Sequence, residues 1–286
     1  MGAGLLARYP EAKSYFDRAS VFLDYDLLEL CLNGPDELLN ATVHSQPALF
    51  VHSVASLASL AHRQPEWMQS VVGAAGLSLG EYSALAAAGV LEFEDGVRLV
   101  QQRGAAMQAA ADSQPSGMAS VLGLSIEDVQ AVCEAACLPG EILQVANLLC
   151  PGNTAISGHR ASLEAAEAIA IQKGAMRFIR LAVAGAFHTA IMNPAVDRLK
   201  TAMAAVPMKR ASFPVYSNVD AAPHVEPKDF SSLLAQQVVT PVRWEASLRG
   251  LIAEGVEQFY EIGAGRVLAG TLKRIERKMA CECVGD

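Results

Sequence analysis

Ser78, at a predicted strand-to-helix turn, is the strongest candidate for a catalytic residue in the sequence. The segment GLSLG at residues 76–80 matches the G-x-S-x-G pattern, with a short apolar run before it and a small-residue helical stretch after it. On such a turn the hydroxyl of Ser78 projects outward, while the helix N-terminus and the backbone N–H of Leu79 can stabilise an oxyanion. We therefore interpret Ser78 as a nucleophile. The alternative is a tight turn that the serine merely caps.

A serine nucleophile needs a base, because a free hydroxyl is a weak nucleophile near neutral pH. His188 falls in a loop between a predicted strand and a long predicted helix, a common place for functional side chains. It is our candidate base, and a surface histidine that caps the following helix is the alternative. The remaining histidines fall on helices, turns or polar stretches, and we interpret them as structural or solvated: His44, His52, His62, His159 and His224.

Arg103 falls close to the apolar stripe of a predicted helix rather than opposite it. Val100 and Met107 belong to that stripe, so the guanidinium is expected to be buried. A buried guanidinium needs an anionic partner. That partner is either an internal Asp or Glu or a carboxylate on the substrate, and the sequence leaves both open.

The order of predicted elements indicates an α/β protein with a small domain inserted into a larger one. Strands at 118–124, 143–148, 154–157 and 176–183 and helices at 126–136 and 161–173 give the order β-α-β-β-α-β of a ferredoxin-like unit. On either side, strands alternate with helices, which predicts a parallel, helix-covered sheet like that of α/β-hydrolases. We assign residues 1–113 and 189–286 to the large domain and residues 114–188 to the inserted ferredoxin-like subdomain.

Composition excludes several other classes of protein. The formal net charge of −8 and the lack of a basic stripe argue against a nucleic-acid partner, since such binding depends on clustered cations. Apolar stretches fall short of the roughly 18 residues that span a bilayer, so we expect no membrane partner. The six cysteines form no C-x-x-C pair, which indicates reduced thiols and no metal site.

Long segments of the sequence resemble the malonyl-CoA:acyl carrier protein transacylase family, in family order and over nearly the whole chain. The segments that carry this resemblance are SQPAL at 45–49, GLSLGEYSALAAAGVLEF at 76–93, VQQRGAAMQ at 100–108, GAFHTAIMNPA at 185–195, VYSNVDA at 215–221, QQVVTPVRW at 236–244 and YEIGAGRVL at 260–268. The resemblance implies that Ser78 is the nucleophile, that His188 is its base, and that Arg103 pairs with the free carboxylate of the malonyl group.

The same resemblance implies roles for residues around this trio. In the family a backbone carbonyl rather than an acid orients the histidine, and the matching position is Gln237. Gln46 and Asn147 match polar positions that line the acyl pocket. Phe187, which precedes the histidine, resembles the malonyl-selective form of that loop.

The reaction implied by the resemblance is a two-step transfer. Ser78 takes the malonyl group from malonyl-CoA, CoA leaves, and the phosphopantetheine thiol of acyl carrier protein takes the group from the serine. This chemistry needs no cofactor and no metal, and malonyl-CoA is a substrate. We expect the protein to be a monomer. We expect its location to be the mitochondrial matrix, because the segments at 42–47 and 115–118 resemble mitochondrial members more than bacterial ones. The bacterial cytoplasm is the alternative location.

The sequence departs from the family pattern in two places. Leu77 stands where the family usually has a histidine, so we expect altered packing or ester stability there. Family members also begin with a strand and a glutamine loop ahead of the segment matching Met1. We therefore expect a shortened chain with an exposed sheet edge and one oxyanion donor fewer, a loss that typically costs about 10²–10³ in rate.

Two other functions are compatible with the same turn. A serine hydrolase, either an esterase or a thioesterase, uses an equivalent nucleophile but has no need of a cation at Arg103. A shortened form that binds the carrier with little turnover is the second alternative.

Overall fold

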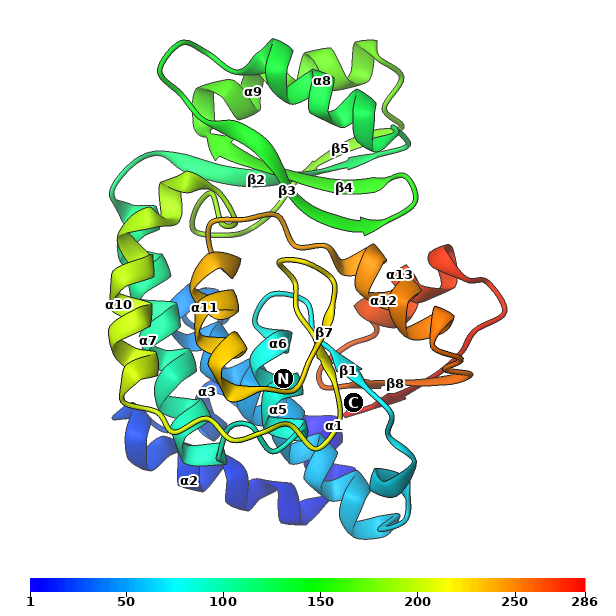
Figure 1. The fold of residues 1–286 in the computed structure, drawn as a ribbon. Helices are drawn as coiled ribbons and strands as arrows, with labels where there is room; N and C mark the ends of the chain where they lie inside the picture. Colours follow the sequence, from blue (N-terminus) through cyan, green and yellow to red (C-terminus); the bar gives the residue numbers. More distant parts are fainter. Residues whose placement is uncertain (286) are drawn as a thin grey trace.

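The structure, a computed structural model, describes residues 1–285 and places a small sheet domain over a larger, helix-rich body (Figure 1). The α-helices are α1 (Ala3–Arg8), α2 (Lys13–Leu23), α3 (Leu27–Asn33), α4 (Asp36–Asn40), α5 (Thr42–Arg63), α6 (Gly80–Ala87), α7 (Phe93–Asp112), α8 (Ile126–Ala136), α9 (Arg160–Gln172), α10 (Asn193–Ala204), α11 (Pro227–Gln237), α12 (Trp244–Ala253) and α13 (Val267–Ile275). Short 3-10 helices are η1 (Pro10–Ala12), η2 (Trp67–Ser70) and η3 (Ala190–Met192). The strands are β1 (Ala74–Ala75), β2 (Ser116–Leu122), β3 (Leu143–Cys150), β4 (Asn153–His159), β5 (Arg177–Arg180), β6 (Val215–Tyr216), β7 (Pro223–His224), β8 (Gln258–Ile262) and β9 (Ala280–Val284).

The small domain has the ferredoxin-like arrangement that the sequence predicts. Its sheet has the strand order β3-β4-β2-β5 with antiparallel neighbours, and α8 and α9 cover the same face (Figure 1). The period-two pattern of β2 and β4 puts Val121 and Ile156 in a core of their own with Leu163 of α9. The α/β class is confirmed, while the domain limits at residues 114 and 188 stay a prediction.

The large domain contains two separate sheets instead of the single parallel sheet that the sequence predicts. Parallel pairing is confirmed between β1 and β6 and between β8 and β9, but these pairs belong to two separate sheets, and β7 joins β6 in the antiparallel sense. The strand expected from the apolar run before Ser78 is shorter than that run. Residues 67–70 form η2 instead, and only Ala74–Ala75 find strand partners, because β6 itself is two residues long.

Two unpaired sheet edges face one another across an apolar groove. Within residues 1–285, β1 pairs only with β6 and β8 only with β9. Both strands line a cavity of about 550 Å³, together with apolar side chains such as Leu57, Leu251 and Phe259. We call this cavity the β1–β8 groove. It leaves β1, the strand that leads to Ser78, supported on one side.

Helices α5 and α7 form the centre of the large domain and bring distant polar residues together. At Gly104 of α7 an added Cβ would lie 2.8 Å from the backbone oxygen of Thr42, so only glycine allows this approach. A Cβ at Gly96 would lie 2.3 Å from the ring of Phe50. The close crossing sets the first turn of α5 against the middle of α7, where Arg103 lies.

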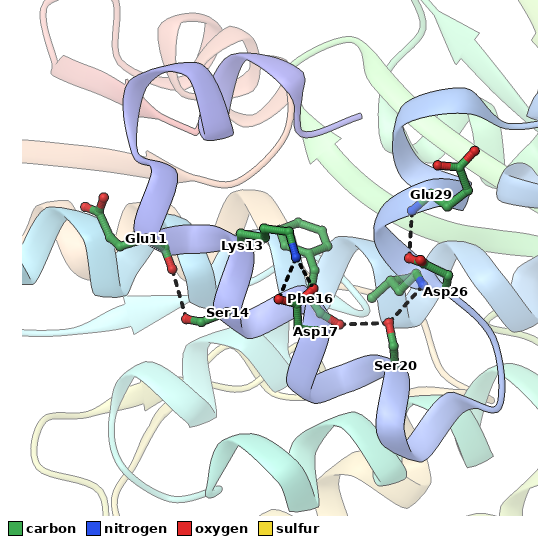
Figure 2. A network of polar contacts seen from close by, with 9 residues as sticks. Glu11, Lys13, Ser14, Phe16, Asp17, Ser20, Asp26 and Glu29 are labelled. Atoms are coloured by element: carbon green, nitrogen blue, oxygen red, sulfur yellow. Dashed lines mark hydrogen bonds and ion pairs between the residues drawn. The ribbon is translucent and has the colours of Figure 1, made fainter.

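The N-terminal helices are held together by local polar contacts, which Figure 2 shows. Ser20 of α2 donates to the carbonyl of Phe16 at 2.9 Å and accepts from the N–H of Leu27 at 3.0 Å, which links α2 to the start of α3. Asp26 caps α3 by accepting from the N–H of Glu29 at 2.9 Å. These contacts fix the turn between the two helices, and α2 in turn packs against α5 and α7.

Candidate active site

The turn that carries Ser78 has the strained geometry of a nucleophile elbow. Ser78 has a φ of 50°, a left-handed conformation that residues with a side chain seldom adopt. Gly76 is required on the incoming side, because a Cβ there would lie 1.9 Å from the carbonyl carbon of Gly80. Asn218, after β6, clamps the turn: its Oδ1 accepts from the N–H of Ser78 and its Nδ2 donates to the carbonyl of Gly76, both at 2.7 Å. The hydroxyl is thereby held at the N-terminus of α6.

Ser78 and His188 form a hydrogen-bonded pair. Nε2 of His188 lies 2.9 Å from Oγ of Ser78, and Nδ1 lies 2.8 Å from the backbone oxygen of Gln237. A carbonyl oxygen only accepts, so Nδ1 carries the proton and Nε2 presents its lone pair to the serine hydroxyl. The backbone N–H of His188 also donates to the carbonyl of Val238 at 3.1 Å. The end of α11 thus fixes both the tautomer and the orientation of the imidazole.

Burial keeps His188 neutral. The side chain is 2% exposed, and loss of solvation lowers its pKa to about 4; the bond to Gln237 opposes this shift and the charge of Arg103 adds to it. An uncharged imidazole able to accept a proton is therefore present at every pH well above about 4.

This pKa shift predicts a pH-dependent contribution to stability. The unfolded imidazole has a pKa of 6.5, so between pH 6.5 and about 4 the unfolded chain binds this proton more strongly than the folded protein does. The stabilisation is complete above pH 6.5 and is lost as the pH falls. We expect the free energy of unfolding of His188→Asn, measured by urea titration, to decline less over this range than that of the wild type. Asparagine tolerates the φ of 62° at this position.

The matched control for this measurement is His62→Asn, since His62 is exposed on α5. That variant should follow the wild-type pH dependence. Parallel curves for wild type and His188→Asn would show that His188 is solvated rather than buried neutral.

Arg103 brings a buried positive charge to the serine. Its side chain is 1% exposed, and its N–H groups donate to Oγ of Ser78 at 3.0 Å, to Oε1 of Gln46 at 2.7 Å and to Oε1 of Gln237 at 2.9 Å. The guanidinium also lies 5.2 Å from the ring centre of Tyr82. Burial lowers the pKa of Arg103 from its ordinary value, as expected for a cation removed from water.

The partners of Arg103 in the described chain are neutral. Among residues 1–285 no carboxylate pairs directly with the guanidinium, and its Nε has no hydrogen-bond partner. The sequence left two possible partners for Arg103 open, an internal Asp or Glu and a carboxylate on the substrate. In the described residues no internal Asp or Glu contacts the guanidinium. The charge is available to an anionic ligand bound at Ser78.

Comparison with known proteins shows the family to which the chain belongs. The sequence model of the family described as "Acyl transferase domain" matches residues 1–285. The chain belongs to this acyl transferase family. The class expected from the sequence, an acyltransferase, is confirmed.

The relatives of this acyl transferase are malonyl-CoA-acyl carrier protein transacylases. It is 40% identical to the human mitochondrial enzyme over 284 residues, which cover 96% of this chain and 73% of that one. It is also 40% identical to the enzyme of Bacillus subtilis over 288 residues, which cover all of this chain and 89% of the relative.

Solved structures of malonyl-CoA-acyl carrier protein transacylases have the same fold as this chain. The malonyl-CoA-acyl carrier protein transacylase of Coxiella burnetii superposes with a TM-score of 0.93 at 36% identity, over all of this chain and 89% of that one. A malonyl-transacylase solved in complex with its type II PKS acyl-carrier protein gives a TM-score of 0.95 at 36% identity, over all of this chain and 91% of that one.

The remaining residues that the sequence assigned to the site of this acyl transferase are Leu79, Asn147 and Phe187. The N–H of Leu79, at the N-terminus of α6, has no partner in residues 1–285 and remains a candidate oxyanion donor. Asn147 of β3 is 9% exposed, and its Oδ1 has no partner within the described residues. Phe187 packs on a small cluster with Met118. Within residues 1–285 neither Asn147 nor Phe187 forms a hydrogen bond with Ser78, so their pocket-lining roles stay predictions. Leu77 packs on the apolar cluster around α12.

Two further residues of the site were not predicted from the sequence. Asn218 holds the elbow, and Glu81 lies buried beneath it. Glu81 carried a local signal, because it is the single charged residue of the small-residue helix α6. Asn218 lies inside the VYSNVDA segment, but nothing near it in the sequence points to a contact 140 residues away. The described residues contain no cluster of side chains suited to a metal ion and no helix long and apolar enough to cross a membrane.

Proposed function

We propose that this acyl transferase moves a malonyl group from malonyl-CoA to the phosphopantetheine thiol of an acyl carrier protein, through an ester on Ser78. The observation that carries the proposal is the buried guanidinium of Arg103, 3.0 Å from the serine hydroxyl and without a direct carboxylate partner. A cation in that position suits an acyl group that ends in a carboxylate. Neutral acyl groups would leave the guanidinium without an anionic partner in direct contact.

The first half of the reaction follows from the geometry of the pair. Oγ of Ser78 attacks the thioester carbon while Nε2 of His188, 2.9 Å away, takes the hydroxyl proton. The negative charge that develops on the carbonyl oxygen lies near the N-terminus of α6, where the N–H of Leu79 is free to donate. The carbon–sulfur bond then breaks, and the CoA sulfur takes the proton from His188.

The second half runs the same steps in reverse order with a different thiol. The carrier thiol gives its proton to Nε2 of His188 and attacks the malonyl ester, and Ser78 leaves with that proton. Arg103 binds the malonyl carboxylate throughout, which requires its contact with Oγ of Ser78 to yield when the ester forms. Each proton accepted by His188 is returned, so no cofactor is needed.

The partner, the assembly and the location are parts of the same proposal. The complex of a related malonyl-transacylase with an acyl-carrier protein supports the carrier as acceptor. We also propose that the protein works as a monomer. The human and mouse relatives are named as mitochondrial, and this supports the mitochondrial matrix as the location.

The test is transfer to the carrier by the 286-residue chain itself. After mixing with malonyl-CoA and holo-acyl carrier protein, we expect intact mass spectrometry to show carrier that has gained one malonyl group. The apo-carrier, which lacks the phosphopantetheine thiol, is the control and should stay unmodified. Free malonate and CoA without malonyl-carrier would indicate a serine hydrolase. Carrier binding with neither product would indicate a binding protein without turnover.

A further inference from the structure

Glu81 is a buried carboxylate that none of the reaction steps above uses. It lies in the first turn of α6 and is 1% exposed. Its Oε2 accepts from Nε2 of Gln237 at 2.6 Å and from the backbone N–H of Asn218 at 3.1 Å. Burying a carboxylate is costly unless hydrogen bonds and a nearby cation compensate. A carboxylate buried beneath the nucleophile therefore calls for a role.

The side chain of Gln237 connects Glu81 to Arg103. Its Nε2 donates to Glu81 and, at 3.0 Å, to the backbone oxygen of Ser78. Its Oε1 accepts from Nη2 of Arg103 at 2.9 Å. The backbone oxygen of the same residue holds His188. Gln237 thus contacts each member of the trio through a separate polar group.

Glu81 is one of the partners that set the orientation of the Gln237 amide, and at 2.6 Å it makes the shortest of these contacts. The two ends of an amide have the same shape, so the hydrogen-bond partners fix its orientation. An ionised carboxylate only accepts, and therefore the NH₂ end must face Glu81. The oxygen is then left for Arg103, which only donates. With a neutral group at position 81 the amide would lose its charged acceptor, and the weaker contacts with Ser78 and Arg103 would hold it alone.

The amide also separates the two charges. Glu81 compensates the positive charge of Arg103 through Gln237 rather than by direct contact. A direct ion pair would occupy the N–H groups that an incoming carboxylate needs. The intervening amide keeps the guanidinium directed at Ser78 while a counter-charge remains buried nearby.

From these contacts we propose that Glu81 is a positioning residue for acyl-group selection: by fixing the Gln237 amide it holds Arg103 against Ser78 and so maintains the preference for acyl groups that carry a carboxylate. The inference rests on the proposed role of Arg103 and adds the residue that sets it.

The test compares Glu81→Gln with a matched control. Glutamine preserves the shape and removes the charge, so we expect kcat/KM for malonyl-CoA to fall about ten-fold, mainly through KM, while slow transfer from acetyl-CoA is unchanged. Glu261→Gln is the control, because Glu261 is also a buried carboxylate that accepts from backbone N–H groups, at Leu268 and Ala269, in another part of the fold. It should keep the wild-type preference. Thermal unfolding of each variant verifies that it is folded.

The pH dependence of the preference provides a second readout. Burial raises the pKa of Glu81 to about 7, against the opposing effects of Gln237, Asn218 and Arg103. In the wild type the preference for malonyl-CoA should therefore weaken below about pH 7, and in Glu81→Gln it should be flat there. The other charged or titratable groups that face Glu81 are Arg103, Tyr82 and Asp220, and they are unchanged in the variant.

The possible outcomes separate this inference from the proposed function. A folded Glu81→Gln protein with the full wild-type preference at every pH would overturn the role of Glu81 alone. A wild-type protein that does not prefer malonyl-CoA would overturn the carboxylate clamp itself.

Discussion

The Ser78→Ala variant is expected to form no acyl-enzyme and to transfer malonyl groups at least about 10³-fold more slowly than the wild type. The hydroxyl is the sole nucleophile in the proposed reaction, and the contacts that hold the elbow do not involve it. The N–H of Ser78 still donates to Asn218, and its carbonyl still accepts from Gln237. The alanine protein should therefore fold and still bind malonyl-CoA.

Intact mass after brief incubation with malonyl-CoA measures this directly. The wild type should gain one malonyl group, and Ser78→Ala none. Ser83→Ala is the control, since Ser83 lies in the same helix but lines the β1–β8 groove. If Ser78→Ala became malonylated, another residue would be the nucleophile, and the assignment of Ser78 to that role would be wrong.

Replacing Arg103 by alanine should produce the second largest effect, a loss of about 10²–10³ in kcat/KM for malonyl-CoA with little change for acetyl-CoA. Truncating one member of a buried, hydrogen-bonded charge pair costs roughly 2–5 kcal/mol, which corresponds to about 30- to 4,000-fold, and the expected loss lies within this range. The effect depends on the acyl group because acetate has no carboxylate to bind. Arg103→Lys should restore part of the rate, since an ammonium keeps the charge but lacks the planar fork.

Steady-state kinetics with both thioesters measures the preference. Arg98→Ala is the matched control: Arg98 lies on the same helix but is half exposed and pairs with Asp95 at 2.9 Å. It should leave both substrates unaffected. An Arg103→Ala protein that keeps the full preference for malonyl-CoA would rule out Arg103 as the carboxylate clamp.

The parts of the site that the sequence predicts are those encoded locally. Ser78 stands out through its flanking glycines and the change from strand to helix, and His188 through its loop. Arg103 stands out because a charge falls near an apolar stripe. Each of these signals lies within a few residues, and the ferredoxin-like domain was predictable for the same reason, since its elements follow one another along the chain.

The parts that were missed depend on contacts between distant segments. Asn218 reaches Ser78 across 140 residues, and Glu81 reaches Asn218 across 137. No periodicity or local motif encodes such contacts. The division of the large sheet was missed for a related reason, because strand length here depends on partners rather than on propensity. The role of Gln237 came from family resemblance alone, and the structure places its backbone oxygen 2.8 Å from His188.

The β1–β8 groove has a mechanical consequence for the nucleophile. Ser78 follows a two-residue strand that is braced by β6 on one flank and borders open apolar space on the other. Within residues 1–285 the alignment of Ser78 with His188 does not depend on this short strand alone. It also depends on side chains: the Asn218 clamp on the turn and the Gln237 amide below it. The accuracy of the serine–histidine pair therefore depends on two amides as well as on the strand that delivers the serine.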